Sequence, residues 1–401
     1  MKKTLYLSLL SYLSFLILLA LLLTACGSFP PTGNGATPTP TEQTATPTPV
    51  HADQYLIYVY KDAANAWHLQ RYNTRTGQKT DIYRTDAGQI TEAQISADGQ
   101  RILFLTELYP AMQTNGSARL QVIERGGQGL ETLYTVANGK SVRGLEWSPD
   151  QRFIAFEQDR NVYLLTVATR TTRLVVPAHG DQGFMPRTWL DTTRLYLSPF
   201  VGSELPPLNL SLLDITTMAV RQVLSLPTLG GDFDSSIDAS TLYTSQYVFA
   251  MPTATGPASI EARPATGGQA TTIYRSAAYA ITALRVASPT WLLFIIHNTG
   301  AGNVDSSHNG LWKIKTDGTG LSRLTSEISD ERTMFPTFTQ YVWSTISRDG
   351  TLYAVKTVQT TGPGATASLL FGSMSGGKPA VVSTGAASTL EIVGWTTMES
   401  H

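Results

Sequence analysis

The chain has 401 residues, which is enough for one large all-β domain or for two ordinary domains. Its formal net charge is −1 and only 15% of its residues are charged, so the composition excludes a strong electrostatic attraction to nucleic acid or to an anionic membrane surface. The 33 glycines and 21 prolines favour a turn-rich β protein over a helical one.

The chain begins with the pattern of an export signal. Two lysines are followed by an uncharged apolar run over 5–23, which ends in the tetrapeptide LTAC, 23–26. This ending resembles the lipobox of bacterial lipoprotein precursors, in which the cysteine thiol takes a diacylglyceryl group. We therefore predict a signal peptide over 1–25 and lipidation of Cys26. An uncleaved helical anchor is the alternative, because the run is nearly long enough to span a bilayer.

Cys26 is the only cysteine in the chain. An exported domain with no other cysteine has no disulfide and no thiol catalyst. Several acyl chains on Cys26 would anchor the protein stably in a membrane. We expect the protein to be held at the cell membrane by this lipid anchor, facing the periplasm or the cell surface.

The segment after the signal cannot form a core. Residues 26–50 contain almost no large apolar side chains and repeat the dipeptide Thr-Pro. Proline restricts its own backbone and that of the preceding residue to extended conformations. We therefore predict a semi-rigid stalk over 26–50 and a single domain over 51–401.

The domain repeats one hairpin pattern. Close copies are AQISADGQRILFLTE (93–107), LEWSPDQRFIAFEQD (145–159) and STISRDGTLYAVKT (344–357), and weaker copies lie at 187–199, 235–246 and 284–296. Neighbouring copies are roughly 40 to 60 residues apart, which is the period of propeller blades. In Ser-x-Asp-Gly the serine bonds the turn backbone, and Gly99 or Gly350 takes the left-handed conformation. A second hairpin, clearest at 310–326, gives each unit about four strands.

This hairpin, together with LWKIKTDGTGLSRLT (311–325), resembles the TolB-like propeller repeat, which also occurs in the propeller domains of prolyl oligopeptidase relatives. The resemblance covers nearly everything after residue 52 and implies an all-β propeller that binds proteins or peptides through one face and the central channel. Counting the copies predicts seven four-stranded blades, with six or eight as alternatives. Because 54–85 holds three strands and 389–398 holds one, we expect the C-terminal strand to pair with the first blade and close the ring.

Two recurring positions have structural interpretations. Asp98, Asp150 and Asp349 lie at the same turn of different copies, which favours turn capping over paired catalytic carboxylates. At one position just before the turn, some copies have a tryptophan and others have an aliphatic residue. This shared position, or register, favours packing between blades. The residues of this register are Trp147, Trp189, Trp395, Ile95, Ile237, Val286 and Ile346.

The segment GSMSGGKP, 372–379, matches the first part of a phosphate-binding loop. Pro379 stands where that loop needs Ser or Thr, and the repeat places a hairpin turn there without a helix. We therefore expect no nucleotide site, and the sequence indicates no cofactor.

A polar loop over 297–310 gathers His297, Asp305 and His308, whose side chains are of types that bind zinc or calcium. Their spacing matches no metal motif, so the pattern favours a loop that meets solvent. These three residues are the metal-site candidates of the chain.

Longer irregular loops lie over 107–119, 199–209 and 247–259. Propellers present function on loops held by a rigid scaffold, so Tyr109 and Phe200 are candidates for a docking rim.

We expect the protein to be a binding or scaffold module of the cell envelope with a protein or peptide partner. The alternative is a propeller enzyme that acts on glycans or peptides with carboxylates in the central channel. No Gly-x-Ser-x-Gly elbow is present, and no catalytic residue is assigned. Inward carboxylates with raised pKa values would favour the enzyme, whereas an apolar patch rimmed by loops would favour the binding module.

Overall fold

The computed structural model describes residues 53–200, 208–226, 230–250, 253–300, 304–328, 331–337, 342–359 and 364–398. The chain divides into the units Met1–Val50 and His51–His401, and all of the described residues belong to the second. The predicted signal peptide, Cys26 and the stalk therefore lie outside the described residues. Within the described ranges, no helix is long and apolar enough to cross a membrane.

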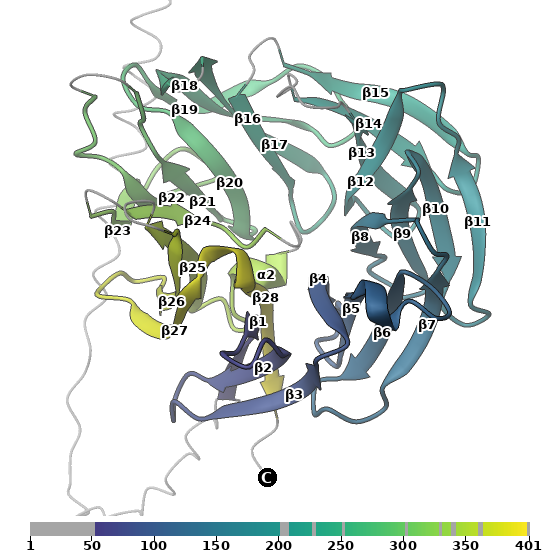
Figure 1. Ribbon diagram of the computed structural model, residues 1–401. Coiled ribbons are helices and arrows are strands. Elements are labelled where there is room, and N and C mark those ends of the chain that lie inside the picture. The colour runs from purple at the N-terminus through teal and green to yellow at the C-terminus, as the bar shows by residue number, and fades with distance from the viewer. Residues whose placement is uncertain are drawn as a thin grey trace, which may run out of the picture. The chain divides into compact units, whose positions relative to one another are not determined.

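The chain forms seven four-stranded antiparallel sheets, the blades of a β-propeller, which follow one another around a central axis (Figure 1). The prediction of seven blades is confirmed. We number the blades in chain order and give the strands of each from the innermost outward. Blade 1 consists of β28 (Leu390–Met398), β1 (Asp53–Lys61), β2 (Trp67–Asn73) and β3 (Lys79–Thr85).

The next three blades are each continuous in sequence. Blade 2 consists of β4 (Gly88–Ile95), β5 (Arg101–Leu108), β6 (Ala118–Glu124) and β7 (Glu131–Val136), with the short 3-10 helix η1 (Pro110–Met112) after β5. Blade 3 consists of β8 (Val142–Trp147), β9 (Phe153–Gln158), β10 (Asn161–Thr166) and β11 (Thr171–Val176). Blade 4 consists of β12 (Gly183–Trp189), β13 (Arg194–Phe200), β14 (Asn209–Asp214) and β15 (Ala219–Ser225).

The last three blades follow the same order. Blade 5 consists of β16 (Gly230–Ser235), β17 (Thr241–Ala250), β18 (Thr253–Pro264) and β19 (Thr271–Ser276). Blade 6 consists of β20 (Ile281–Ser288), β21 (Trp291–Ile296), β22 (Gly310–Lys315) and β23 (Ser322–Ser326). Blade 7 consists of β24 (Glu331–Met334), β25 (Leu352–Gln359), β26 (Thr366–Ser373) and β27 (Ala380–Ala386), with α2 (Val342–Thr345) before β25 and η2 (Ala387–Thr389) after β27.

The turn between the first two strands of a blade is closed by its Ser-x-Asp motif. In blade 2 the hydroxyl of Ser96 donates to the carboxylate of Asp98 at 2.7 Å and accepts the N–H of Arg101 at 2.9 Å, while the N–H of Gln100 donates to Asp98 at 3.0 Å. Burial would raise the pKa of Asp98, but hydrogen bonds led by that of Gln151 outweigh it and lower the pKa. The same bonds recur in three further pairs: Ser148 with Asp150, Ser236 with Asp238, and Ser347 with Asp349. Turn capping by the recurring aspartates is confirmed.

Three residues after the serine, the backbone of this turn takes a positive φ. Gly99 and Gly350 both have φ +72°, as the sequence predicts. The copies without glycine keep the conformation, since Gln151 has φ +62° and Ala239 has φ +59°. The geometry of the turn is therefore maintained even where the side chain disfavours it.

The tryptophan register is buried, as predicted, with one correction. Trp147, Trp189 and Trp395 are 4%, 6% and 0% exposed. Ile237 was assigned to this register wrongly, since it lies between Ser236 and Asp238 in the turn and is 52% exposed. The turn of this copy lacks the glycine by which the copies are aligned in sequence. Its residues were therefore matched incorrectly to those of the other copies.

The hydrophobic core consists of seven clusters within the described residues, one between each pair of neighbouring blades. Between blades 1 and 2, for example, Ile57 and Leu69 pack with Phe104 and Ile123. Each blade therefore buries both of its faces against its neighbours. Such a ring leaves no sheet face without a partner.

The ring closes through the C-terminal strand, as predicted. The strand β28 pairs antiparallel with β1 from Asp53 opposite Met398 to Tyr60 opposite Leu390. In Figure 1 the last strand lies beside the first one. The guanidinium of Arg348 links this closure to blade 2, because it donates to the carbonyl oxygens of Trp395, Ala97 and Ser96 at 3.0, 2.7 and 3.0 Å.

Candidate functional site in the central channel

A cavity of about 570 Å³ lies where the innermost strands of the blades converge. Its walls come from β4, β8, β12, β16, β20, β21 and β24 and from the residues after β24. Its volume is in the range of small-molecule sites. Seven of its lining residues carry charge: Glu92, Glu146, Asp232, Arg143, Arg187, Arg285 and Arg332.

Bulges in the inner strands turn residues toward the cavity. The pairing of β12 with β13 shifts between Pro186 and Thr188, which leaves Arg187 as the extra residue. Likewise Thr91 is the extra residue of β4 and Thr282 that of β20, and all three line the cavity. Bulges re-aim side chains in this way beside many functional sites.

Two of the channel carboxylates bond the inner strand of the next blade. The carboxylate of Glu92 accepts the N–H groups of Gly144 and Leu145 at 2.9 and 2.7 Å, where a bulge in β8 frees them. The carboxylate of Asp232 accepts the N–H of Leu284 at 3.0 Å. Glu92 and Asp232 each lie four residues before the serine of their turn, so they occupy equivalent positions. These two carboxylates therefore join neighbouring blades.

The side chains two residues further on repeat this link. The amide oxygen of Gln94 accepts the N–H of Trp147 at 2.7 Å, and the carboxylate of Asp234 accepts the N–H of Val286 at 2.8 Å. Burial raises the pKa of Asp234 to about 7, although the charge of Arg285 and the backbone hydrogen bonds act in the opposite direction. Asp234 does not line the cavity, so its role is structural.

Burial also raises the pKa values of two carboxyl groups in the cavity wall. It raises the pKa of Glu92 to about 7, against the two backbone hydrogen bonds that favour the charged form. It raises the pKa of Glu146 well above the ordinary value, against the attraction of Arg187 and with a further contribution from Glu92. Inward carboxyl groups with raised pKa values are therefore present in the channel.

The arginines of the cavity differ in how they are bound. Arg285 donates to the carboxylate of Asp232 at 2.7 Å. Arg143, Arg187 and Arg332 form no hydrogen bond or ion pair with another described residue. Their guanidinium groups are thus the cationic groups of the wall that the described protein atoms leave available to a ligand.

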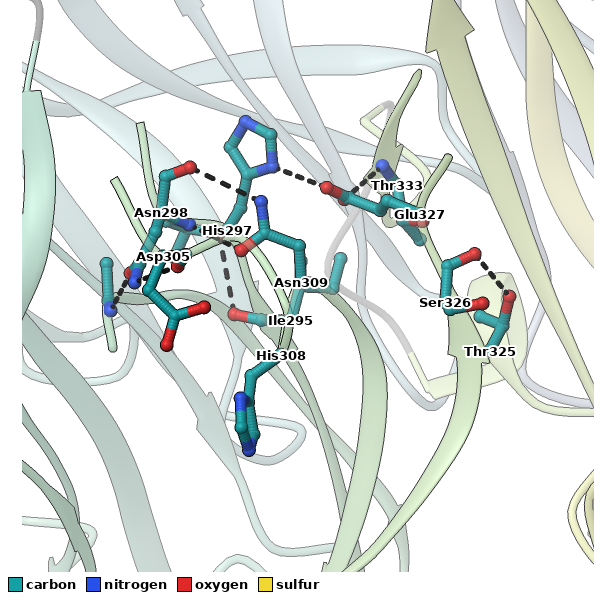
Figure 2. Close-up of polar contacts among 12 residues, drawn as sticks. Ile295, His297, Asn298, Asp305, His308, Asn309, Thr325, Ser326, Glu327 and Thr333 are labelled. Atoms are coloured by element: carbon teal, nitrogen blue, oxygen red, sulfur yellow. Dashed lines mark hydrogen bonds and ion pairs between the residues drawn. The ribbon is translucent and has the colours of Figure 1, made fainter. Parts of the chain in front are cut away.

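The metal candidates of the sequence have separate partners. His297 Nδ1 lies 2.7 Å from a carboxylate oxygen of Glu327, whose other oxygen accepts the N–H of Thr333 in the cavity wall at 2.6 Å (Figure 2). The amide of Asn298 bonds the backbone of Asp305, and Figure 2 shows the ring of His308 pointing away from His297. No group of three or more His, Cys, Asp and Glu side chains within the described ranges is arranged to hold a metal ion.

Asp305 and His308 instead contact aromatic side chains. The hydroxyl of Tyr279 donates to the carboxylate of Asp305 at 3.1 Å, and the ring of His308 stacks between Tyr279 at 4.1 Å and Trp312 at 5.9 Å. The Cζ atom of Arg323 lies 5.8 Å from the centre of the Trp312 ring. The loop is therefore held against blade 6 by stacking and hydrogen bonds.

The proposed docking rim is only partly described. Tyr109 is half-buried, and its N–H donates to the carbonyl oxygen of Ala87 at 3.0 Å. Phe200 ends β13 opposite Gly183, and its side chain lies outside the described residues. Residues 201–207, the middle of the second candidate loop, lie outside them as well.

A second cavity of about 620 Å³ lies between the outer strands of blades 6 and 7. Its wall includes Ile328 and Val381, which are 57% and 58% exposed. The segment 372–379 reaches this cavity through Lys378, and it forms the turn between β26 and β27, as predicted. No helix follows this turn, since β27 begins at Ala380.

Sequence reasoning missed the charged residues of the channel. The signal was present, because each of them is a charged residue in a strand two to five residues before a turn or lies in the short strand β24. Strand periodicity alone could not show that residues about 50 positions apart face one cavity. That requires the bulges and the ring.

Comparisons with known proteins agree with this fold. Residues 30–182 match the protein family described as Lipoprotein LpqB beta-propeller domain. A comparison with curated protein sequences gave no match.

Three solved structures illustrate the structural similarity. TolB from Acinetobacter baumannii is 14% identical and has a TM-score of 0.45, with 85% of this chain and 82% of that chain covered. A putative TolB from Agrobacterium tumefaciens is 13% identical and has a TM-score of 0.41, with 87% of this chain and 100% of that chain covered. A prolyl endopeptidase is 11% identical and has a TM-score of 0.55, with 86% of this chain and 50% of that chain covered. The protein is a seven-bladed β-propeller, and its residues 30–182 match the family described as Lipoprotein LpqB beta-propeller domain.

Proposed function

We propose that this protein is a lipid-anchored binding protein of the cell envelope, and that its propeller binds a ligand or a partner protein at the cavity of the central channel. The lipobox at Cys26 and the match to a lipoprotein propeller family support the anchor. The observation that carries the binding role is that some charged groups of the channel are bonded to neighbouring strands and others are not. Glu92 and Asp232 are bonded to the next blade, whereas Arg143, Arg187 and Arg332 face the cavity without a bonded partner among the described residues.

The anchor is tested by metabolic labelling of the expressed protein with an alkyne-bearing fatty acid. Wild-type protein should carry the label and sediment with membranes, whereas a Cys26→Ser variant should carry none. A Cys26→Ser protein that still sediments with membranes would show an uncleaved helical anchor. Label on that variant would refute lipidation at this residue.

The binding role is tested by crosslinking from defined positions in the native envelope. A photoreactive phenylalanine analogue at Met185 would report on the cavity wall, and the same analogue at Leu174, 46% exposed on β11, would serve as the control. A crosslinked protein or a ligand mass on Met185 and not on Leu174 is expected. Equal crosslinking at both positions, or none at Met185, would contradict binding in the channel.

A second candidate function is a channel enzyme that processes glycans or peptides. The raised pKa values of Glu92 and Glu146 favour it, because a protonated carboxyl group is suited to act as a general acid near neutral pH. Turnover of a glycan or peptide library that disappears in Glu146→Gln would support it. The control variant Asp349→Asn removes a carboxylate from a turn that does not line the cavity, and it should leave such turnover in place.

A further inference from the structure

The charges around the channel cavity do not balance. Four of the lining residues are arginines and three are carboxylates. Two of these carboxylates, Glu92 and Glu146, have pKa values raised by burial, so they carry less than a full negative charge near neutral pH. The cavity wall is therefore positively charged overall.

Arg285 is already partly bound. Its Nη1 donates to the carboxylate of Asp232 at 2.7 Å and to the carbonyl oxygen of Leu284 at 2.5 Å. The residue is only 7% exposed, and its Nε is buried without a hydrogen-bond partner among the described residues. Leaving a buried donor without a partner costs about 1–3 kcal/mol. Of the eight buried side-chain polar atoms without a partner among the described residues, those of Arg285 and Thr91 belong to residues of the cavity wall. Arg285 thus has hydrogen-bond donor capacity that the described residues leave unused.

Arg187 comes from a different blade and has no bonded partner among the described residues. A bulge places it in the cavity wall, with its Cζ atom 5.9 Å from the centre of the Phe233 ring. Burial lowers the pKa of Arg187, the charges of Asp232 and Glu146 raise it, and the charge of Arg285 lowers it. The charge of Asp232 thus acts on both guanidinium groups, which repel each other. A second anion beside Arg187 would relieve this repulsion.

We propose that the channel cavity binds an oxyanion, a carboxylate or phosphate group of its ligand, between Arg187 and Arg285. This inference rests on the proposed binding function and names the chemistry of the ligand. Guanidinium groups bind both kinds of oxyanion through paired N–H donors. Arg332, which is exposed in the same wall, receives a second negative group of a larger ligand.

A cavity of about 570 Å³ accepts either a small anion with several carboxylates or the C-terminal end of a peptide. Both present the same carboxylate chemistry to the arginines. Four probes separate these sources: citrate, inorganic phosphate, a short peptide with a free C-terminus, and the same peptide with an amidated C-terminus.

The test is a thermal unfolding series on the full chain in detergent, with each probe compared with sodium chloride at equal ionic strength. A ligand that binds only the native state raises the Tm with its concentration. We expect at least one oxyanion probe to raise the Tm of the wild type by about 2 °C or more at saturation. Arg187→Gln should abolish this rise, and Arg187→Lys should retain part of it.

The matched control is Arg173→Gln, which removes the same charge from an exposed position on β11. It should respond to the probes as the wild type does. Should Arg187→Gln fail to fold, Arg332→Gln provides the second test and should weaken the response to citrate more than the response to phosphate. No probe effect beyond that of chloride, or a full response in Arg187→Gln, would overturn the proposal.

The outcome is separable from that of the proposed function. Crosslinking at Met185 without any oxyanion effect would leave a channel-binding protein whose ligand is not anionic. An oxyanion effect without a crosslinked protein would identify a small-molecule binder, and a response to the free but not to the amidated peptide would identify a peptide C-terminus as the source.

Discussion

The Nζ atom of Lys356 lies 2.9 Å from a carboxylate oxygen of Glu391, and both residues are 7% exposed. Lys356 belongs to blade 7, whereas Glu391 is on the strand that completes blade 1. The same ammonium group donates to the carbonyl oxygen of Ala387 at 2.8 Å, and the carboxylate also accepts the N–H of Thr337 at 3.2 Å. This buried ion pair joins the two ends of the ring.

Lys356→Met should destabilise the domain by about 3–5 kcal/mol, because it leaves the carboxylate of Glu391 buried without its counter-ion. The double variant Lys356→Met with Glu391→Gln should recover most of this loss, because the neutral amide still accepts the backbone N–H groups. Urea unfolding of the two single variants and the double variant measures the coupling. Lys140 pairs with Asp159 at 2.9 Å with both side chains 46% exposed, so the control Lys140→Met should cost under about 1 kcal/mol. Equal losses in the two lysine variants would contradict the importance of burial.

Deletion of residues 389–401 should destabilise the whole domain. The deletion removes β28, which supplies the inner strand of blade 1 and the carbonyl oxygen of Trp395 that binds Arg348. It leaves β1 as an unpaired edge and exposes the apolar faces of blades 1 and 7. A clear fall in Tm is expected in calorimetry, and a synthetic peptide of residues 389–401 should restore part of it. An unchanged Tm would refute closure by this strand.

Ala239→Gly should stabilise the domain, and Gly350→Ala should destabilise it. Both positions have positive φ in equivalent turns, and nothing lies within 4 Å of a Cβ atom built on Gly350, so the backbone alone decides the effect. A left-handed conformation costs an ordinary residue roughly 1–2 kcal/mol, and the greater freedom of glycine in the unfolded chain offsets part of this. The free energies of unfolding, measured by denaturant titration, should therefore shift in opposite directions, by about 1 kcal/mol each. A shift of the same sign in both variants would contradict this account.

Stability should fall as the pH rises from about 4.5 to 7. Burial raises the pKa values of Glu92 and Asp234 to about 7, and it raises the pKa of Glu146 well above its ordinary value. In this window the native state therefore binds more protons than the unfolded state, so the free energy of unfolding decreases as the pH increases. Each group contributes a slope of up to about 1.4 kcal/mol per pH unit. Urea unfolding between pH 4.5 and 8 measures this slope.

Two variants identify the groups that cause this pH dependence of stability. Glu92→Gln and Asp234→Asn should each flatten the pH dependence, because each removes one group with a raised pKa. Asp349→Asn should leave this window unchanged, since hydrogen bonds from Ser347 and Thr351 outweigh burial and lower the pKa of Asp349. A wild-type stability that is constant between pH 4.5 and 7 would show that neither carboxyl group is desolvated in solution.

The fold was predictable because the residues that close each turn are close together in the sequence. Ser96 with Asp98 and Ser347 with Asp349 close their turns with side chains two residues apart, so the bonds are readable in the sequence. The closure of blade 1 followed from counting strands. Ile237 was misplaced because Ala239 occupies the glycine position of the turn and obscures the alignment.

The candidate site was less predictable, because it depends on long-range geometry. Arg187 reaches the cavity through a bulge, and a strand pattern with period two does not reveal which residue is extra. Arg285 and Asp232 form their ion pair across 53 positions of sequence, from two different blades. The partners of such a pair become neighbours only when the ring closes.

The pairing of β1 with β28 also determines the order in which the blades can be completed during synthesis. A polypeptide is made from its N-terminus, so the three outer strands of blade 1 are made first and its inner strand is made last. Blades 2 to 7 are each complete in one continuous stretch, whereas blade 1 waits for the final segment. The ring, whose closure requires β28 beside β1, is therefore completed only after the segment of β28 has been made.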